Sequence, residues 1–239
     1  MYSPFHLPLA LSFYVLAAVL PTIFLLYYIY RNDTIEKEPP GLLASLLALG
    51  AVAAILSGAL EGLGERMLVR LVDPDSLGYT ILLAFLVIAL IEEGAKFLLL
   101  KWRTWCNPNF NYRFDGIVYA VFISLGFAAY ENIQYVLHYG LSVALPRALL
   151  AVPGHLVFSV LMGCFYGRAK LADSRDNELG AVMNLCWSFL VAVLLHGFYD
   201  TCAMVGTTPA VILFAVFVLT MYLLVYRLIK RESAQDMPV

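Results

Sequence analysis

The sequence predicts an all-α integral membrane protein, a bundle of about seven transmembrane helices. Of its 239 residues, 62% are hydrophobic and 13% are charged, whereas soluble domains carry about 45–50% apolar and about 25% charged residues. The apolar residues form long blocks, each close to the ~20 residues with which a helix crosses a bilayer. A net charge of −2 gives no reason to expect a nucleic-acid partner, and the lipid bilayer is the expected surrounding.

Seven apolar blocks predict the spanning helices in chain order. They cover residues 8–30, 41–63, 78–100, 117–137, 143–166, 181–205 and 208–228. The second and fifth blocks are the least clean, because Glu61 and Arg147 lie near their ends. The longest polar connections are 101–116 and 167–180, so we expect one polytopic membrane domain over residues 1–239.

Basic residues predict the orientation, because Lys and Arg concentrate in cytoplasmic loops. One set of alternate loops holds only Arg66 and Arg70. The other set holds Arg31, Lys37, Lys101, Arg103, Arg113, Arg168, Lys170, Arg175, Arg227, Lys230 and Arg231. We therefore place the N-terminus outside and the C-terminus in the cytoplasm. No Lys or Arg precedes the first block, so that block is not expected to be a cleavable signal peptide.

Ionisable side chains inside the blocks are the informative residues, because a charge at mid-membrane costs at least about 2.5–3.5 kcal/mol on insertion scales. They fall in the third to sixth blocks: Glu92, Glu93, Lys96, Glu131, His155, His196 and Asp200. Such groups usually face a bundle interior or a wet cavity and pair with one another. A rise of about 1.5 Å per residue places them at unequal depths, but helix tilt reduces the difference. We expect them to meet around water inside the bundle.

The third block carries two adjacent glutamates and a lysine. Glu92 and Lys96 are four residues apart and share a helix face, and Glu93 is three residues from Lys96. One lysine neutralises one carboxylate, so the second is expected to lack a local partner and to serve as a general base. The alternative is a structural ion pair beside an interfacial glutamate.

The next three blocks each contribute a candidate residue. Small residues before Glu131 suit close helix approach and turn this side chain toward protein; a hydrogen-bonded helix clamp is the alternative. A Pro-Gly pair directly precedes His155 and can loosen the helix there; a packed, neutral histidine is the alternative. Asp200 follows His196 by four residues and can orient its imidazole.

Four motifs resemble the PrsW family of intramembrane proteases. They are EEGAK at 92–96, FDGIVYAVFISLGFAAYEN at 114–132, PGHLVFSVLMGCFYGRAK at 153–170 and HGFYD at 196–200. Their order matches the family over about 80–205, which marks that region as the catalytic core. The resemblance implies a multi-pass peptidase of the bacterial cytoplasmic membrane. It also implies a single-pass membrane protein substrate such as an anti-sigma factor, in which the best-known member makes the first cut.

PrsW proteins are distantly similar to type II CAAX prenyl endopeptidases and bacteriocin-processing enzymes. In those relatives two glutamates open the first motif, a phenylalanine precedes a histidine by four, and a histidine precedes an asparagine by four. Here Glu92 and Glu93 are kept, Glu131 stands at the first histidine position, and Asp200 stands at the asparagine position. These departures argue against prenyl-protein substrates, and His155 becomes an additional candidate from the PrsW pattern.

Peptide hydrolysis needs an activated water, a group that stabilises the oxyanion and an acid for the leaving amine. We predict Glu92 as the general base, with Glu93 assisting it or pairing with Lys96. The remaining candidates have supporting roles: His196 and His155 as donors to the oxyanion or leaving nitrogen, Asp200 as the group that orients His196, and Glu131 as part of the polar cavity.

Other chemistries remain open from the sequence. His155, His196 and Glu131 are a candidate ligand set for a catalytic zinc, but no HExxH helix is present. A metal-free glutamate mechanism is preferred, so no cofactor is assigned. A proton-coupled transporter also uses buried Glu and His, but the sequence shows no inverted repeat. A receptor or scaffold would leave the buried acids without a purpose.

Overall fold

The computed structural model describes residues 6–239, with side chains from residue 12 onward. The first five residues, which carry the predicted outside N-terminus, lie outside this part. The described chain is helical and contains no strand, only an isolated bridge between Tyr112 and Pro238. In order the elements are α1 (His6–Asn32), α2 (Pro40–Leu68), α3 (Leu77–Leu82), η1 (Leu83–Ala89), α4 (Leu90–Thr104), α5 (Asp115–Tyr139), η2 (Leu141–Val143), α6 (Ala144–Pro146), η3 (Arg147–Ala151), α7 (Val152–Asp173), α8 (Glu178–Val205) and α9 (Thr208–Ala234).

Every apolar block of the sequence is helical, so the predicted all-α membrane protein is confirmed. Six of the described helical segments are long and apolar enough to cross a membrane. The third block is not among these six, although its helix continues from α3 through the π-helical η1 into α4. The presence of about seven spans therefore stays a prediction.

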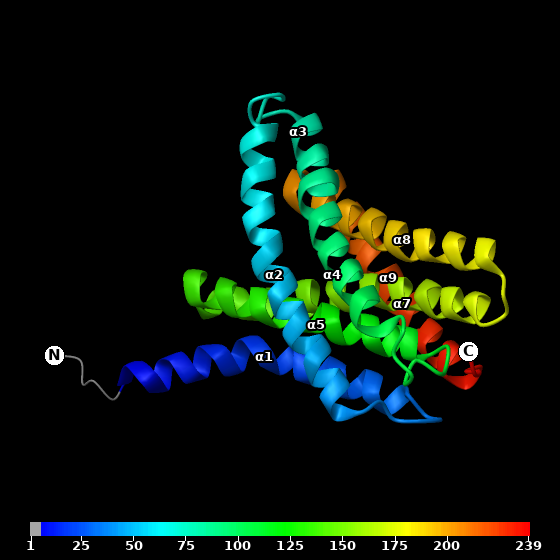
Figure 1. The fold of residues 1–239 in the computed structure, drawn as a ribbon. Helices are drawn as coiled ribbons and strands as arrows, with labels where there is room; N and C mark the ends of the chain where they lie inside the picture. The colour runs from blue at the N-terminus through cyan, green and yellow to red at the C-terminus, as the bar shows by residue number, and fades with distance from the viewer. Residues whose placement is uncertain (1–5) are drawn as a thin grey trace.

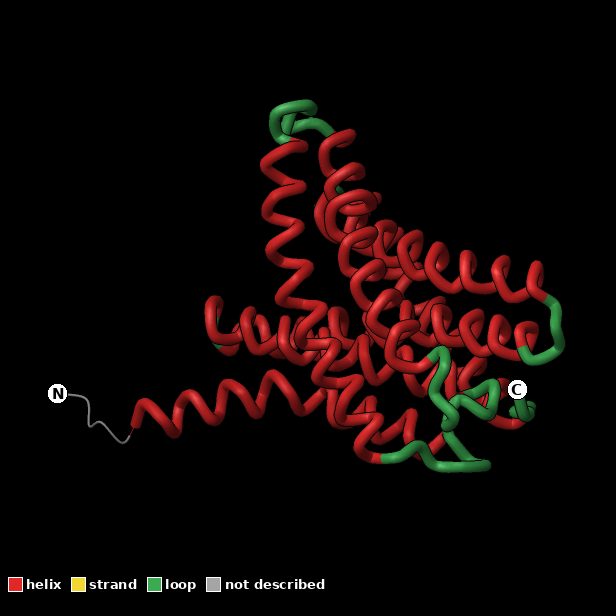
Figure 2. The backbone as a smooth tube through the Cα atoms, in the orientation of Figure 1, coloured by secondary structure: helices red, strands yellow, loops and turns green. Residues whose placement is uncertain are grey.

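Helix α5 lies at the centre of the bundle and packs against α1, α2 and α7. Residues 114–128 are all buried. In Figure 1, α2 and the rod formed by α3 and α4 stand steeply against α1, α5, α7 and α8. Figure 2 shows the 33–39, 105–114 and 174–177 loops near the C-terminus at one end of the bundle, and the α2–α3 loop at the far end. The basic loops and the segment with Arg66 and Arg70 therefore lie at different ends of the bundle, as the orientation prediction requires. Which end meets the cytoplasm stays a prediction.

Small residues allow these helices to cross closely. A methyl group added at Gly126 of α5 would lie 2.3 Å from the Leu47 carbonyl oxygen of α2. One added at Gly163 of α7 would lie 2.5 Å from the Gly116 carbonyl oxygen of α5. Both contacts are with backbone, so no larger residue fits without separating the helices. The prediction of close approach near Glu131 is confirmed, and it brings α2, α5 and α7 together around one interior.

Two π-helical segments precede the helices that carry site residues. Segment η1 leads into α4, and η3 leads into α7. The expected irregularity of the helix therefore comes just before the Pro-Gly pair, in η3. Pro153 itself lies in the first turn of α7, where a backbone N–H would have no partner within the helix, so its absence breaks no hydrogen bond. Tyr222 of α9 donates its hydroxyl to the Leu149 carbonyl at 2.8 Å. This bond satisfies a backbone group that the irregular turn exposes.

The C-terminal residues bind back to the loop between α4 and α5. Arg113 N donates to Met237 O at 2.9 Å, and Val239 N donates to Asn111 O at 2.9 Å. Next to this loop, Tyr119 OH donates to Glu38 Oε2 at 2.6 Å. Burial raises the pKa of Glu38 from its ordinary 4.5 to about 7. The end of the bundle that holds the basic loops therefore also holds a buried acid whose pKa is close to neutral pH.

Candidate active site

The charges of α4 lie inside the bundle, where Lys96 contacts both glutamates. Its Nζ donates to Glu92 Oε2 at 2.9 Å and to Glu93 Oε1 at 2.8 Å. The expectation that one carboxylate lacks a local partner is wrong, because spacings of three and four residues both lie within reach of one lysine. Glu92 is 5% exposed, whereas Glu93 and Lys96 are fully enclosed.

Helix α8 brings His196 and Asp200 against the same group. His196 Nδ1 lies 2.9 Å from Glu93 Oε1, and its Nε2 lies 3.3 Å from Asp200 Oδ2. The predicted pairing of His196 with Asp200 is therefore present, and Glu93 adds a contact that spacing along the chain does not reveal. With a carboxylate at each ring nitrogen, the imidazole of His196 is held firmly in one orientation.

His155 of α7 joins the group from the other side. Its Nδ1 lies 3.3 Å from Lys96 Nζ, and its Nε2 lies 3.1 Å from Glu131 Oε2. An ammonium group only donates hydrogen bonds, so Nδ1 accepts from Lys96 and the Nε2 proton points to Glu131. Phe127, one turn before Glu131, places its ring centroid 3.8 Å from Lys96 Nζ, a cation–π distance.

The sequence did not single out Arg147 and Glu61 as site residues. Arg147 Nη2 donates to Glu131 Oε2 at 3.0 Å, and its Nε donates to Asn132 Oδ1 at 2.7 Å. Glu61 comes from α2, and its Oε1 is buried without a hydrogen-bond partner among the described residues. The available signal was a charged residue near the end of an apolar block. We interpreted it only as a reason why the second and fifth blocks are less uniformly apolar than the others.

These side chains surround a cavity of about 270 Å³, which has room for several water molecules. The carboxylate, guanidinium and imidazole groups that line it come from five segments, namely α2, α4, α5, the η3–α7 segment and α8: Glu61, Glu92, Glu131, Arg147, His155, His196 and Asp200. Glu93 does not line the cavity and lies behind Glu92. The predicted meeting of these carboxylates and imidazoles is confirmed, while their catalytic roles stay predictions.

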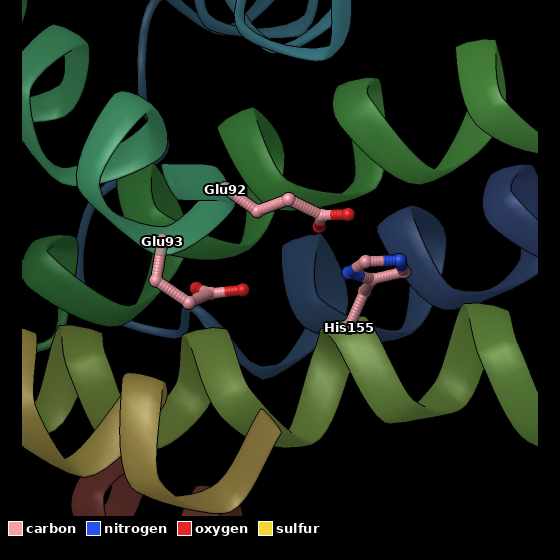
Figure 3. A group of neighbouring side chains, drawn as sticks. All are labelled: Glu92, Glu93 and His155. Atoms are coloured by element: carbon pink, nitrogen blue, oxygen red, sulfur yellow. The ribbon is translucent and has the colours of Figure 1, made fainter. Parts of the chain in front are cut away.

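In the part of the chain whose side chains are described, one group of residues has the donor types and proximity for a metal ion. Glu92, Glu93 and His155 each offer one ligand atom within 4.8 Å of the others, and Figure 3 shows them pointing toward a common space. Of the set expected from the sequence, only His155 belongs to this group. These are also the three residues that Lys96 Nζ contacts. The group therefore does not fit a divalent ion while the ammonium lies at its centre.

Comparison with known proteins gives one family. A model described as PrsW family intramembrane metalloprotease matches residues 38–226, which include all the site residues named above. Protease PrsW of Geobacillus kaustophilus is 35% identical over 77% of this chain and 76% of the relative. The protein of the same name from Oceanobacillus iheyensis is 32% identical over 91% of this chain and 94% of the relative. Protease PrsW of Bacillus subtilis is 33% identical over 77% of this chain and 79% of the relative.

No solved structure matches the chain. The family match covers most of the sequence, and the relatives are matched over most of their own length. The long apolar helices and the relatives together show that this is a multi-pass bacterial membrane protein. The relatives also favour the peptidase hypothesis over the transporter and receptor alternatives. The chain belongs to the PrsW family of intramembrane proteases.

Proposed function

We propose that this protein is an endopeptidase that cuts single-pass membrane proteins, with Glu92 as the general base that activates water. The supporting observation is that Glu92, unlike Glu93, lines the cavity. Glu93 lies behind it between Lys96 and His196. The first carboxylate can meet water and substrate, and the second holds the surrounding cations in position.

The proposed reaction is metal-free hydrolysis. Glu92 takes a proton from water as the water oxygen attacks the carbonyl carbon of the scissile bond. N–H groups at the cavity wall stabilise the oxyanion, and His155 and His196 are the candidates. The proton then passes to the leaving nitrogen, the C–N bond breaks, and a carboxyl group and an amine result.

The location of the site favours a membrane-embedded substrate. The cavity lies between helices of the bundle, and we expect a peptide to reach it from within or beside the bilayer. The low dielectric constant of the surrounding helices strengthens each electrostatic contact with the transition state. A membrane-bound anti-sigma factor is the substrate class that we propose from the family resemblance, and its cleavage would be the first cut.

Cleavage of a single-span reporter in proteoliposomes tests this proposal. Glu92→Gln keeps the shape of the side chain and removes the base, so product formation should fall to background. Glu65→Gln changes an exposed glutamate of α2 and is the matched control, with activity expected at the wild-type level. Turnover retained in Glu92→Gln would remove Glu92 from the role of base. Activity lost in chelator and recovered with zinc would reject the metal-free mechanism.

A further inference from the structure

Lys96 lies among the three residues that form the candidate metal group. Its Nζ is 2.9 Å from Glu92 Oε2, 2.8 Å from Glu93 Oε1 and 3.3 Å from His155 Nδ1. Among the described residues, these three are also the ones whose ligand atoms come within 4.8 Å of one another. These distances place a positive charge among the three side chains that Figure 3 draws.

The ammonium is fixed in this place. Lys96 has no exposed surface, and its Nζ also faces the Phe127 ring at 3.8 Å from the centroid. A lysine near a helix end can extend to water and leave its stem in the apolar layer. Lys96 instead turns inward, where two carboxylates, an imidazole and an aromatic face all favour a cation.

A metal ion and this ammonium exclude each other. Zinc binds carboxylate oxygen and imidazole nitrogen at about 2.0–2.2 Å, so an ion bonded to this group would lie in contact with Nζ. Two cations at contact repel strongly where water is scarce. Glu93 Oε2 is buried without a hydrogen-bond partner among the described residues. The acid therefore has an unused oxygen that a metal could take if the ammonium were removed.

We infer that the ammonium of Lys96 is the resident cation of this site, and that Glu92, Glu93 and His155 form a latent zinc site which the lysine keeps closed. The inference deepens the proposed function by naming what neutralises the paired glutamates. It rests on that function only for its activity readout, because metal content is measured without substrate. The description of the family as metalloproteases then does not extend to the resting site of this chain.

The test measures zinc bound per chain in the purified full-length protein. Wild type, Lys96→Met and the control Lys101→Met, an exposed lysine of the same helix, are incubated with Zn²⁺, freed of excess ion and analysed by mass spectrometry. We expect wild type and Lys101→Met to hold no zinc and Lys96→Met to hold one ion per chain. Adding Glu92→Gln to Lys96→Met should remove that ion. Zinc should also raise the melting temperature of Lys96→Met and leave that of wild type unchanged.

If Lys96→Met does not fold, Lys96→Gln provides the same test with a polar side chain. A folded neutral variant that binds no zinc would overturn the latent site. A wild-type protein that holds one zinc, and loses it in Glu92→Gln, would overturn the role of Lys96. Wild-type cleavage that needs zinc would also refute this inference while keeping the peptidase. A zinc-free wild type without any cleavage would instead count against the proposed function.

Discussion

Arg147 is expected to position Glu131, and through it His155. Its guanidinium donates to Glu131 Oε2 at 3.0 Å and to Asn132 Oδ1 at 2.7 Å. The same Glu131 oxygen lies 3.1 Å from His155 Nε2. Arg147 therefore acts on His155 only through Glu131, and replacing it tests the arrangement without altering the proposed base.

Arg147→Gln removes both hydrogen bonds. A hydrogen bond to a charged group contributes about 1.5–3 kcal/mol, so the two together contribute about 3–6 kcal/mol. Glu131 keeps its contact with His155, which places the expected loss near the lower end, at about 3 kcal/mol. For a chain of this size each kcal/mol corresponds to about 2–4 °C. The melting temperature should therefore fall by roughly 10 °C.

The kinetic effect follows from the position of His155. A displacement of about 1 Å in a catalytic group can reduce the rate on the order of 100-fold. With the single-span reporter in proteoliposomes, Arg147→Gln should lower kcat by about that factor and leave KM nearly unchanged. The pH profile of kcat should also shift, because Glu131 loses the guanidinium that donates to it. Arg147→Lys keeps the charge without the planar fork and should recover part of the rate.

Arg66→Gln is the control, because Arg66 is exposed near the end of α2. This variant should match wild type in both melting temperature and kcat. Two results would refute the reasoning. One is wild-type kcat in a folded Arg147→Gln protein; the other is a stability loss with an unchanged pH profile, which would make Arg147 only a structural residue.

Three further predictions concern other parts of the molecule. Asp200→Asn keeps the size of the side chain that faces His196 at 3.3 Å and should lower kcat by about 10- to 100-fold through loss of imidazole orientation, measured against unchanged reporter binding. Gly163→Ala places a methyl group 2.5 Å from a backbone oxygen of α5 and should destabilise the bundle by about 1–3 kcal/mol, which denaturant unfolding in detergent would show; a stability equal to wild type would contradict the close packing. Glu38 has its pKa raised to about 7 by burial, so the folded state binds this proton more tightly than the unfolded chain and stability falls as pH rises from about 4.5 to about 7. Glu38→Gln should weaken the dependence of the melting temperature on pH between about 4.5 and about 7. An unchanged dependence would show that Glu38 does not cause it.

The helices and the chemistry of the site are largely readable from the sequence. Apolar blocks of spanning length predict helices because a backbone in lipid must satisfy its own hydrogen bonds. Charged residues inside such blocks mark the site because the bilayer penalises them wherever the chain later folds. The pairing of Lys96 with Glu92, and of His196 with Asp200, follows from helix geometry within a single element.

Contacts between helices are not encoded in such local patterns. The sequence could not show that Glu93 meets His196, that Lys96 meets His155, or that Arg147 supports Glu131. These contacts depend on how each helix is rotated and tilted against its neighbours, and close crossings at small residues determine both. Helices α2 and α4 also cross the other helices steeply (Figure 1), which the apolar blocks alone do not predict.

That this protein is helical, lies in a membrane and carries acids and imidazoles where lipid would reject them could be predicted from the amino-acid sequence, because each of these properties depends on residues close together in one helix. The folded bundle was needed to show which of those groups touch, which carboxylate faces the cavity, and that a lysine lies where a metal would bind. Those outcomes depend on the packing of separate helices, and packing is a property of the whole bundle.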